Sequence, residues 1–415
     1  MIKIIENREQ ELSKLCSKLI QAKGENPPGN VSETANIIEQ FLETEGINHR
    51  RFEPTKGHAS VTATVGKGKP SLILCGHIDV VPAGDFARWG FHPYKGEIKE
   101  GKIMGRGATD QKGGVAAMLI AFAAVKEFES EIQSTITAAS VSDEEALGPG
   151  GALWLLRNKK LTGNVCLITE PTGRLDDAYS IVAGERGTCW LKIRAHGKPA
   201  HGSKPALGKN AITMLTMFLP KLKVLESLAV KVPKDAERLV KNGKNELSQV
   251  AKRKGIPTGN LSRALNHYTV NVGTIAGGTK VNIVPENCEA EIDIRVPPGG
   301  HPSGVEEFVR SVLPQDLTYE IVNRIMPSYT SAENSLVRTI QQGACRVFGY
   351  KPRATYMAAT SDAHHFREIL GVSTVAFGPG YLELAHAYDE FVYAKDLVNM
   401  AKVYANVIAN FAARA

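Results

Sequence analysis

Short runs of apolar residues alternate with longer segments of helical periodicity along the first part of the chain. The runs at 71–75 and 164–169, and the Thr-, Ile- and Val-rich segment 134–141, have the length and composition of buried strands. Segments 113–128 and 150–158 between them predict helices. Strands that are buried on both faces and alternate with helices predict an α/β fold, a mixed, mostly parallel sheet with helices on both faces.

The pattern changes from about Gly184 onward. The segments 189–195, 268–275 and 288–295 predict strands, and 211–225 and 303–313 predict helices. This block is typical of a smaller two-layer α+β domain, with helices on one side of an antiparallel sheet. The strand and helix alternation returns after Pro327. We therefore predict one α/β domain built from residues 1–183 and 330–415, interrupted by an inserted domain over residues 184–329.

Charge and composition exclude several classes of function. Lys and Arg total 50 against 43 Asp and Glu, and the formal charge of +7 is spread along the 415 residues. The densest basic stretch, 252–254, is too short for a nucleic-acid footprint, so no nucleic-acid partner is expected. A solvated face is the favoured interpretation of that surplus, although a mild attraction for anionic substrates is also possible on this charge.

The cysteines and the apolar segments bear on the compartment. Six cysteines are scattered without a Cys-x-x-Cys pair, which argues against a disulfide scaffold and against a thiolate zinc site. The N-terminus lacks the apolar core of a signal peptide, and the longest apolar stretch, 115–125, is too short to span a bilayer. A cytoplasmic protein with no membrane partner is expected.

Residues that can bind metals follow the predicted strands. His77 and Asp79 come just after the strand at 71–75, Glu144 and Glu145 follow the strand at 134–141, and Glu170 ends the strand at 164–169. Asp110 sits in a Gly-rich loop just before the apolar helix at 113–128, and His386 follows the last predicted strand. Ligands collect at the carboxyl ends of strands in open α/β sheets.

Each of these motifs is weak alone. His-x-Asp occurs often by chance, and adjacent acids more commonly form a solvated loop or a helix N-terminus. Together they place two histidines and several carboxylates in one crevice. A mixed set of this kind suits zinc, or cobalt or manganese as alternatives. Two ions need a shared carboxylate, and Asp110 on its Gly-flanked loop fits that place.

The chain resembles a known family of di-zinc metallohydrolases. Its members include acetylornithine deacetylase, succinyl-diaminopimelate desuccinylase, aminoacylase and glutamate-releasing carboxypeptidases. The resemblance covers nearly the whole chain, in order. It rests on Gly-His-Ile-Asp-Val-Val-Pro at 76–82, Gly-Arg-Gly-Ala-Thr-Asp-Gln-Lys-Gly-Gly at 105–114, Asp-Glu-Glu at 143–145, Thr-Glu-Pro at 169–171, Pro-Ala-His-Gly-Ser at 199–203 and Ala-His at 385–386.

The resemblance implies a role for each matching residue. His77 and Glu170 would hold one metal ion, Glu145 and His386 the other, and Asp110 would bridge the two. Asp79 would orient His77, and Glu144 would be the general base. His201 would help to stabilise the oxyanion, coming from the partner subunit in dimeric relatives. Arg295 and Asn282 would bind the substrate carboxylate, with Gly380 offering a backbone contact beside it.

Some of these assignments depend on the resemblance entirely. Taken alone, His201 is a surface histidine and Arg295 an ordinary strand-end arginine. His364 and His365 are adjacent, so we expect their rings to point apart and to have a structural role. The Lys-rich segment 233–254 departs from the compact form of the family, and its role in substrate choice or subunit contact stays open.

These observations predict a metal-dependent amidohydrolase. The resemblance implies that it would remove the acyl group from a small, carboxylate-bearing N-acyl amino acid, of the acetylornithine or succinyl-diaminopimelate type, through attack by a metal-bridging hydroxide. A carboxypeptidase or dipeptidase of the same family is the alternative. A metal-bound binding protein without activity is the alternative of another class. The resemblance further implies that the inserted domain is a lid and dimerisation domain of a homodimer.

Overall fold

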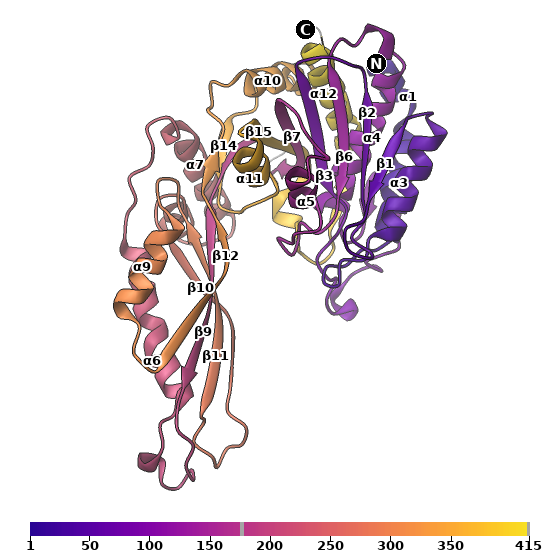
Figure 1. Ribbon diagram of the computed structural model, residues 1–415. Coiled ribbons are helices and arrows are strands. Elements are labelled where there is room, and N and C mark those ends of the chain that lie inside the picture. The colour runs from indigo at the N-terminus through magenta and orange to yellow at the C-terminus, as the bar shows by residue number, and fades with distance from the viewer. Residues whose placement is uncertain (175–177, 413–415) are drawn as a thin grey trace. The chain divides into compact units, whose positions relative to one another are not determined.

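The computed structural model describes residues 1–174 and 178–412 (Figure 1). The chain divides into two compact units. The first contains Met1–Ala183, Thr330–Ala354 and Ser361–Ala415, and the second contains Gly184–Tyr329 and Thr355–Thr360. The short return at 355–360 is a feature that the sequence patterns did not separate from the first domain.

The first unit is built on a sheet whose centre is parallel. Strands β3, β6, β7 and β15 run in the same direction, whereas β2 is antiparallel to β6. The predicted α/β class is confirmed. The strands follow the order β1 (His49–Phe52), β2 (Ser60–Val65), β6 (Thr135–Val141), β3 (Ser71–His77), β7 (Val165–Gly173), β15 (Ser373–Tyr381) and β8 (Ile181–Glu185).

Helices cover both faces of this sheet (Figure 1). Helix α4 (Gly113–Lys126) is buried over almost its whole length, because it lies between β3, β7 and β15 and the helices α2 (Glu9–Gln21) and α12 (Ala394–Ala412). This position explains its nearly uniform apolar sequence. The remaining helices are α1 (Ile2–Asn7), α3 (Ser32–Thr44), α5 (Ala152–Arg157), α10 (Ser335–Phe348) and α11 (Ala363–His365).

A small antiparallel sheet of the first unit joins the loop before Asp110 to the chain after His386. It has the order β16 (Phe391–Tyr393), β5 (Lys102–Met104) and β4 (Glu97–Lys99). The pairing of β16 with β5 is antiparallel, with Phe391 opposite Met104. Two segments far apart in the sequence are therefore adjacent at this point.

The second unit contains a four-stranded antiparallel sheet. Cys189, Leu191 and Ile193 of β9 face a core formed with the helices, while the residues between them are more exposed. This alternation is typical of a sheet with one solvated face. The strand order is β10 (Thr269–Gly277), β11 (Asn287–Val296), β9 (Gly187–His196) and β12 (Leu317–Ile325), and the packed helices are α6 (Ala211–Leu222) and α9 (Pro302–Val312).

Two features of the second unit lie outside this sheet. The Lys-rich segment forms one helix, α7 (Glu237–Arg253), which packs on α8 (Thr258–Ser262) and buries Leu239, Val240 and Ala251. The short strands β13 (Ser328–Tyr329) and β14 (Ala354–Met357) pair with β8. Within the described residues, no helix combines the length and apolarity needed to cross a bilayer.

Candidate metal centre

The strand register of the first unit brings His77 and Glu170 to the same level. Cys75 of β3 lies opposite Ile168 of β7 in a parallel pair, so the two candidate ligands, each two residues further on, lie at the same level. His77 ends β3, whereas β7 continues past Glu170 to Gly173, beyond the strand end that the sequence predicted. Nε2 of His77 lies 3.7 Å from Oε1 of Glu170. The carboxyl ends of neighbouring parallel strands therefore supply the first pair of ligands, as expected for this class of sheet.

Asp110 lies between the two histidines. Its Oδ1 is 3.0 Å from Nε2 of His77, and its Oδ2 is 3.3 Å from Nε2 of His386. The residue sits in the irregular turn Ala108–Lys112 that leads into α4. Because each carboxylate oxygen faces a different histidine, the geometry suits a carboxylate shared by two cations.

Glu145 completes the second group. Its Oε2 lies 3.1 Å from Nε2 of His386, and its other carboxylate oxygen accepts the backbone N–H of Val81 at 3.3 Å. His386 follows β15 on an exposed loop and has a φ of 60°. His386, Glu145 and Asp110 thus meet at one point although they come from three separate loops.

Asp79 is buried beneath these residues. Nδ1 of His77 donates to the main-chain oxygen of Asp79 at 2.9 Å and is 3.6 Å from its carboxylate. The carboxylate accepts the backbone N–H groups of Glu144 and Glu145 at 3.2 and 3.1 Å. Donation by Nδ1–H leaves the Nε2 lone pair of a neutral His77 free for a metal.

The electrostatics of the cluster call for a cation. Burial opposes the charged form of His77, but hydrogen bonds to Asp110 and Asp79 raise its pKa well above the ordinary value. Hydrogen bonds to Asp110 and Glu145 raise the pKa of His386 to about 10. Burial raises the pKa of Glu145, and the neighbouring Asp110 carboxylate adds to the rise. Ions of charge +2 would relieve the repulsion among these carboxylates and displace the protons.

Glu144 has the environment of a group that exchanges protons. Burial raises its pKa well above the ordinary value, despite the charge of His77, and nearby carboxylates such as Glu170 raise it further. Its Oε2 lies 3.9 Å from Nε2 of His77. A carboxyl group with a raised pKa beside a metal site suits a general base that later acts as an acid.

The donor set fits two divalent ions. Ligand atoms of His77, Asp110 and Glu145 lie within 4.8 Å of one another, as do those of His77, Glu144 and Glu170. The set combines imidazole with carboxylates, which suits zinc and its neighbours.

Arg295 lies in the second unit, at the end of β11. Its Nε donates to Oδ2 of Asp293 at 2.9 Å, and its Nη1 donates to Oγ1 of Thr360 at 3.3 Å. Nη2 has no partner among these contacts, so part of the guanidinium fork is available to a carboxylate. Arg295 is only partly exposed.

His201 and Asn282 lie beyond the opposite end of the same sheet. His201 forms an isolated bridge with Ile283, and the backbone N–H of Gly202 donates to the oxygen of Asn282 at 2.8 Å. At about 3.3 Å per residue, the strand from Asn287 to Arg295 alone spans roughly 26 Å. Arg295 is therefore far from the other two predicted residues within one copy of this unit.

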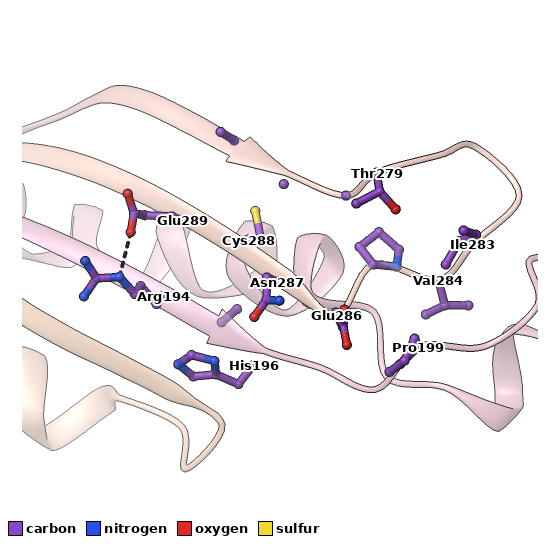
Figure 2. Close-up of a pocket in the computed structure, with 15 residues that line it drawn as sticks. Arg194, His196, Pro199, Thr279, Ile283, Val284, Glu286, Asn287, Cys288 and Glu289 are labelled. Atoms are coloured by element: carbon purple, nitrogen blue, oxygen red, sulfur yellow. Dashed lines mark hydrogen bonds and ion pairs between the residues drawn. The ribbon is translucent and has the colours of Figure 1, made fainter.

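A pocket of about 470 Å³ lies next to the loop that carries Asn282. Figure 2 shows Ile283, Val284 and Pro199 at one end of it and the ion pair of Arg194 and Glu289 at the other. None of the predicted metal ligands lines this pocket.

Three residues of the first unit add to or change the sequence-based view. Gly380 has a φ of 89°, and a Cβ there would come within 2.9 Å of the Thr109 side chain, next to Asp110.

The rings of His364 and His365 are both buried, with centroids 3.7 Å apart. The expectation that they point apart was wrong, because the short helix α11 turns both rings into the same interior.

Sequence reasoning missed Asn26. Its Nδ2 donates to Asp79 at 2.8 Å and to Asp143 at 3.1 Å, and it is buried. Asn26 begins the segment Asn-Pro-Pro-Gly-Asn at 26–30, whose composition is typical of a turn and indicates no chemistry. Contacts of this kind depend on the tertiary fold.

A comparison with protein families matches residues 73–410 to the peptidase family M20/M25/M40. The chain belongs to this family. It is a hydrolase that acts on amide or peptide bonds. The predicted family and enzyme class are thereby confirmed. A Bacillus subtilis protein described as a dinuclear metal-binding peptidase of the M20 family aligns with a TM-score of 0.61 at 14% identity, covering 98% of this chain and 99% of that chain.

Curated relatives resemble the chain over most of its length. A protein of Staphylococcus epidermidis named "Probable succinyl-diaminopimelate desuccinylase" is 28% identical over 411 residues, covering 96% of this chain and 97% of its own. A succinyl-diaminopimelate desuccinylase of Wolinella succinogenes is 28% identical over 336 residues, covering 80% and 81%.

Solved structures share the fold. The M20 metallo-carboxypeptidase Sso-CP2 of Sulfolobus solfataricus aligns with a TM-score of 0.84 at 20% identity, covering 97% of this chain and 99% of that chain. The dipeptidase Dug1p of Saccharomyces cerevisiae aligns with a TM-score of 0.82 at 16% identity, covering 99% and 98%. These likenesses confirm the predicted architecture.

Proposed function

We propose that this hydrolase removes the acyl group from an N-acyl amino acid whose free carboxylate is bound by Arg295. The observation that carries the proposal is the arrangement around Asp110, whose two carboxylate oxygens face His77 and His386 separately. The names of the curated relatives favour an N-succinyl diamino acid as substrate, with an N-acetyl amino acid such as acetylornithine next.

Two divalent ions, zinc first and cobalt or manganese as alternatives, complete the proposed site. His77 and Glu170 would hold one ion, Glu145 and His386 the other, and Asp110 both. The mixed set of imidazole and carboxylate donors supports this choice. When bound, the ions polarise the amide carbonyl and lower the pKa of a water molecule.

The side chains of this chain carry the proton transfers in the proposal. Glu144 takes a proton from the attacking water and delivers it to the nitrogen of the leaving amine. Its raised pKa supports both halves of that task, because a carboxyl group that holds its proton more tightly than usual can accept one from water and return it to the amine. Asp79 acts through other residues. It orients His77 and fixes the turn that carries Glu144 and Glu145.

Arg295 positions the substrate. The guanidinium binds a substrate carboxylate away from the scissile bond. The energy of this contact positions the amide for attack. Asn282 is proposed to share this carboxylate, and Gly380 to offer a backbone contact.

A homodimer is part of the proposal. Arg295 and the pair His201 and Asn282 lie at opposite ends of one rigid sheet, so they cannot reach one small substrate from the same copy. We infer that His201 and Asn282 enter the site from the partner subunit, where His201 stabilises the oxyanion.

Metal content and turnover test the proposal together. Purified protein should hold two equivalents of zinc or cobalt, and Asp110→Ala should lose most of both. Metal-loaded protein should hydrolyse N-succinyl-diaminopimelate or N-acetylornithine faster than a panel of dipeptides. Faster turnover of the dipeptides would overturn the proposed substrate class in favour of a peptidase, and metal binding without any turnover would favour a binding protein.

A further inference from the structure

Arg106 and Glu390 form a buried ion pair beside the candidate metal centre. Nη1 of Arg106 lies 2.6 Å from Oε2 of Glu390, and the two residues are 3% and 0% exposed. The roles proposed above use neither side chain. A buried pair of this kind is costly to desolvate, so its contacts deserve a functional explanation.

Glu390 holds the backbone that carries Asp110. Its Oε1 accepts the N–H of Thr109 at 2.8 Å and that of Asp110 at 3.0 Å. The main-chain oxygen of Glu390 also accepts the N–H of Gly105 at 2.9 Å. Glu390 therefore binds the backbone of this segment both before Arg106, at Gly105, and after it, at Thr109 and Asp110.

Arg106 holds the backbone that carries His386. Its Nη1 donates to the main-chain oxygen of Ala387 at 3.0 Å, and its Nη2 approaches that of His386 at 3.4 Å. Its guanidinium also lies over the Trp89 ring, 5.1 Å from the centroid, which fixes the plane of the fork. The buried Arg106 side chain therefore fixes the backbone of the exposed loop that carries His386.

We propose that the Arg106–Glu390 pair is a positioning device that sets the separation between Asp110 and His386. The arginine reaches from the Asp110 loop to the backbone of His386, and the glutamate reaches from the His386 loop to the backbone of Asp110. This reciprocal exchange holds Oδ2 of Asp110 and Nε2 of His386 at 3.3 Å, within reach of one cation. The inference rests on the proposed assignment of these two residues as ligands.

Glu390→Gln and Arg106→Lys test the inference. The glutamine keeps an oxygen for the two N–H groups but loses the charge, and the lysine keeps the charge but loses the planar fork. Supporting contacts to metal ligands are typically worth about 10–100-fold in metal affinity. We expect calorimetric titration with zinc to show that loss for the ion held by Glu145 and His386, where both Asp110 and His386 are displaced, and a smaller loss for the ion held by His77 and Glu170, where Asp110 alone is displaced.

The visible absorption of bound cobalt is a readout that general destabilisation does not move. In folded variants we expect the second equivalent of cobalt to show a larger spectral change than the first. Arg8→Lys and Glu45→Gln are the matched controls, because Nη1 of Arg8 donates to Oε2 of Glu45 at 3.0 Å in the same unit. These controls should bind both ions as the wild type does.

A double variant, Arg106→Met with Glu390→Gln, guards against failure to fold, since removing both charges avoids leaving one unpaired. It should fold and still bind the second ion more weakly. Wild-type affinity for both ions in this variant or in the folded single variants would overturn the inference alone. A wild-type chain that binds no divalent ion would overturn the proposed metal site and the inference with it.

Discussion

Nδ1 of His77 lies 2.9 Å from the main-chain oxygen of Asp79 and 3.6 Å from its carboxylate. Asp79 thus orients the imidazole chiefly through its backbone, and its side chain accepts the N–H groups of Glu144 and Glu145 instead. These two tasks respond differently to substitution.

Asp79→Asn should separate them. The backbone contact to His77 survives. The side-chain NH₂ of the new asparagine, however, faces a group that is itself a donor: the backbone N–H of Glu144 or Glu145, or the Asn26 amide. We expect kcat to fall about 10–100-fold while zinc affinity at the His77 site stays within about threefold. Steady-state kinetics and metal titration measure the two effects. Equal losses of metal and activity would show that the carboxylate itself orients His77.

Glu144→Ala should keep both metals and lose most turnover. Removing a general base typically costs about 10²–10⁴-fold in kcat, and Glu144 is not among the residues proposed to hold the ions. Metal analysis of the purified variant is the control for intact binding. Normal hydrolysis by this variant would refute the assignment of the base.

Arg295→Met should weaken substrate binding in a way that depends on the carboxylate. A charge-assisted hydrogen bond is worth about 1.5–3 kcal/mol, so kcat/KM should fall at least about tenfold for the acid. An amide analogue of the substrate, which lacks that carboxylate charge, should lose little. Arg194→Met is the matched control, because Arg194 sits on the neighbouring strand and pairs with Glu289 and Glu320.

Mixing two inactive variants tests the partner-subunit role of His201. His201→Ala and Glu144→Ala homodimers each lack one group at both sites. A mixed dimer regains one complete site, so random exchange should restore about a quarter of wild-type turnover. Activity is measured before and after subunit exchange, with exchange verified by differently tagged subunits. No recovery after verified exchange would place His201 in its own chain's site or outside the reaction.

The stability of the first unit should fall below neutral pH because of His364. Burial lowers its pKa to about 4, against 6.5 for the free side chain, although its Nδ1–H donates to the oxygen of Ser361 at 2.5 Å. Below pH 6.5, His364 becomes protonated in the unfolded chain but stays neutral in the folded chain. The stability that this residue contributes above pH 6.5 is therefore lost as the pH falls toward 4. The loss is up to roughly 3 kcal/mol.

His364→Asn isolates this contribution, since Asn keeps a donor near the Nδ1 position and does not titrate. Urea unfolding at pH 7 and pH 5 should show a smaller pH dependence in this variant than in wild type. His196→Asn, at an exposed strand end, is the control. An unchanged pH dependence in His364→Asn would assign the acid sensitivity to other groups.

Much of the fold followed from local patterns. The helix α4 and the strands β3 and β7 were predicted from their apolar runs, and β6 from its Thr-, Ile- and Val-rich composition. Strand β12, at the edge of the four-stranded sheet, was missed. The contribution of residues 355–360 to the second unit was also missed, because no local sequence pattern shows which unit a short segment packs with.

The family and the α/β class could be predicted from the sequence alone, and candidate ligands could be proposed, because motifs such as 105–114 carry chemistry within a few residues. How those ligands meet depends on the tertiary structure. It places the two oxygens of Asp110 against different histidines, fastens the Asp110 and His386 loops to each other through Arg106 and Glu390, and separates Arg295 from His201 by the length of a strand. These relations depend on strand register and on contacts between distant segments, which no local pattern encodes.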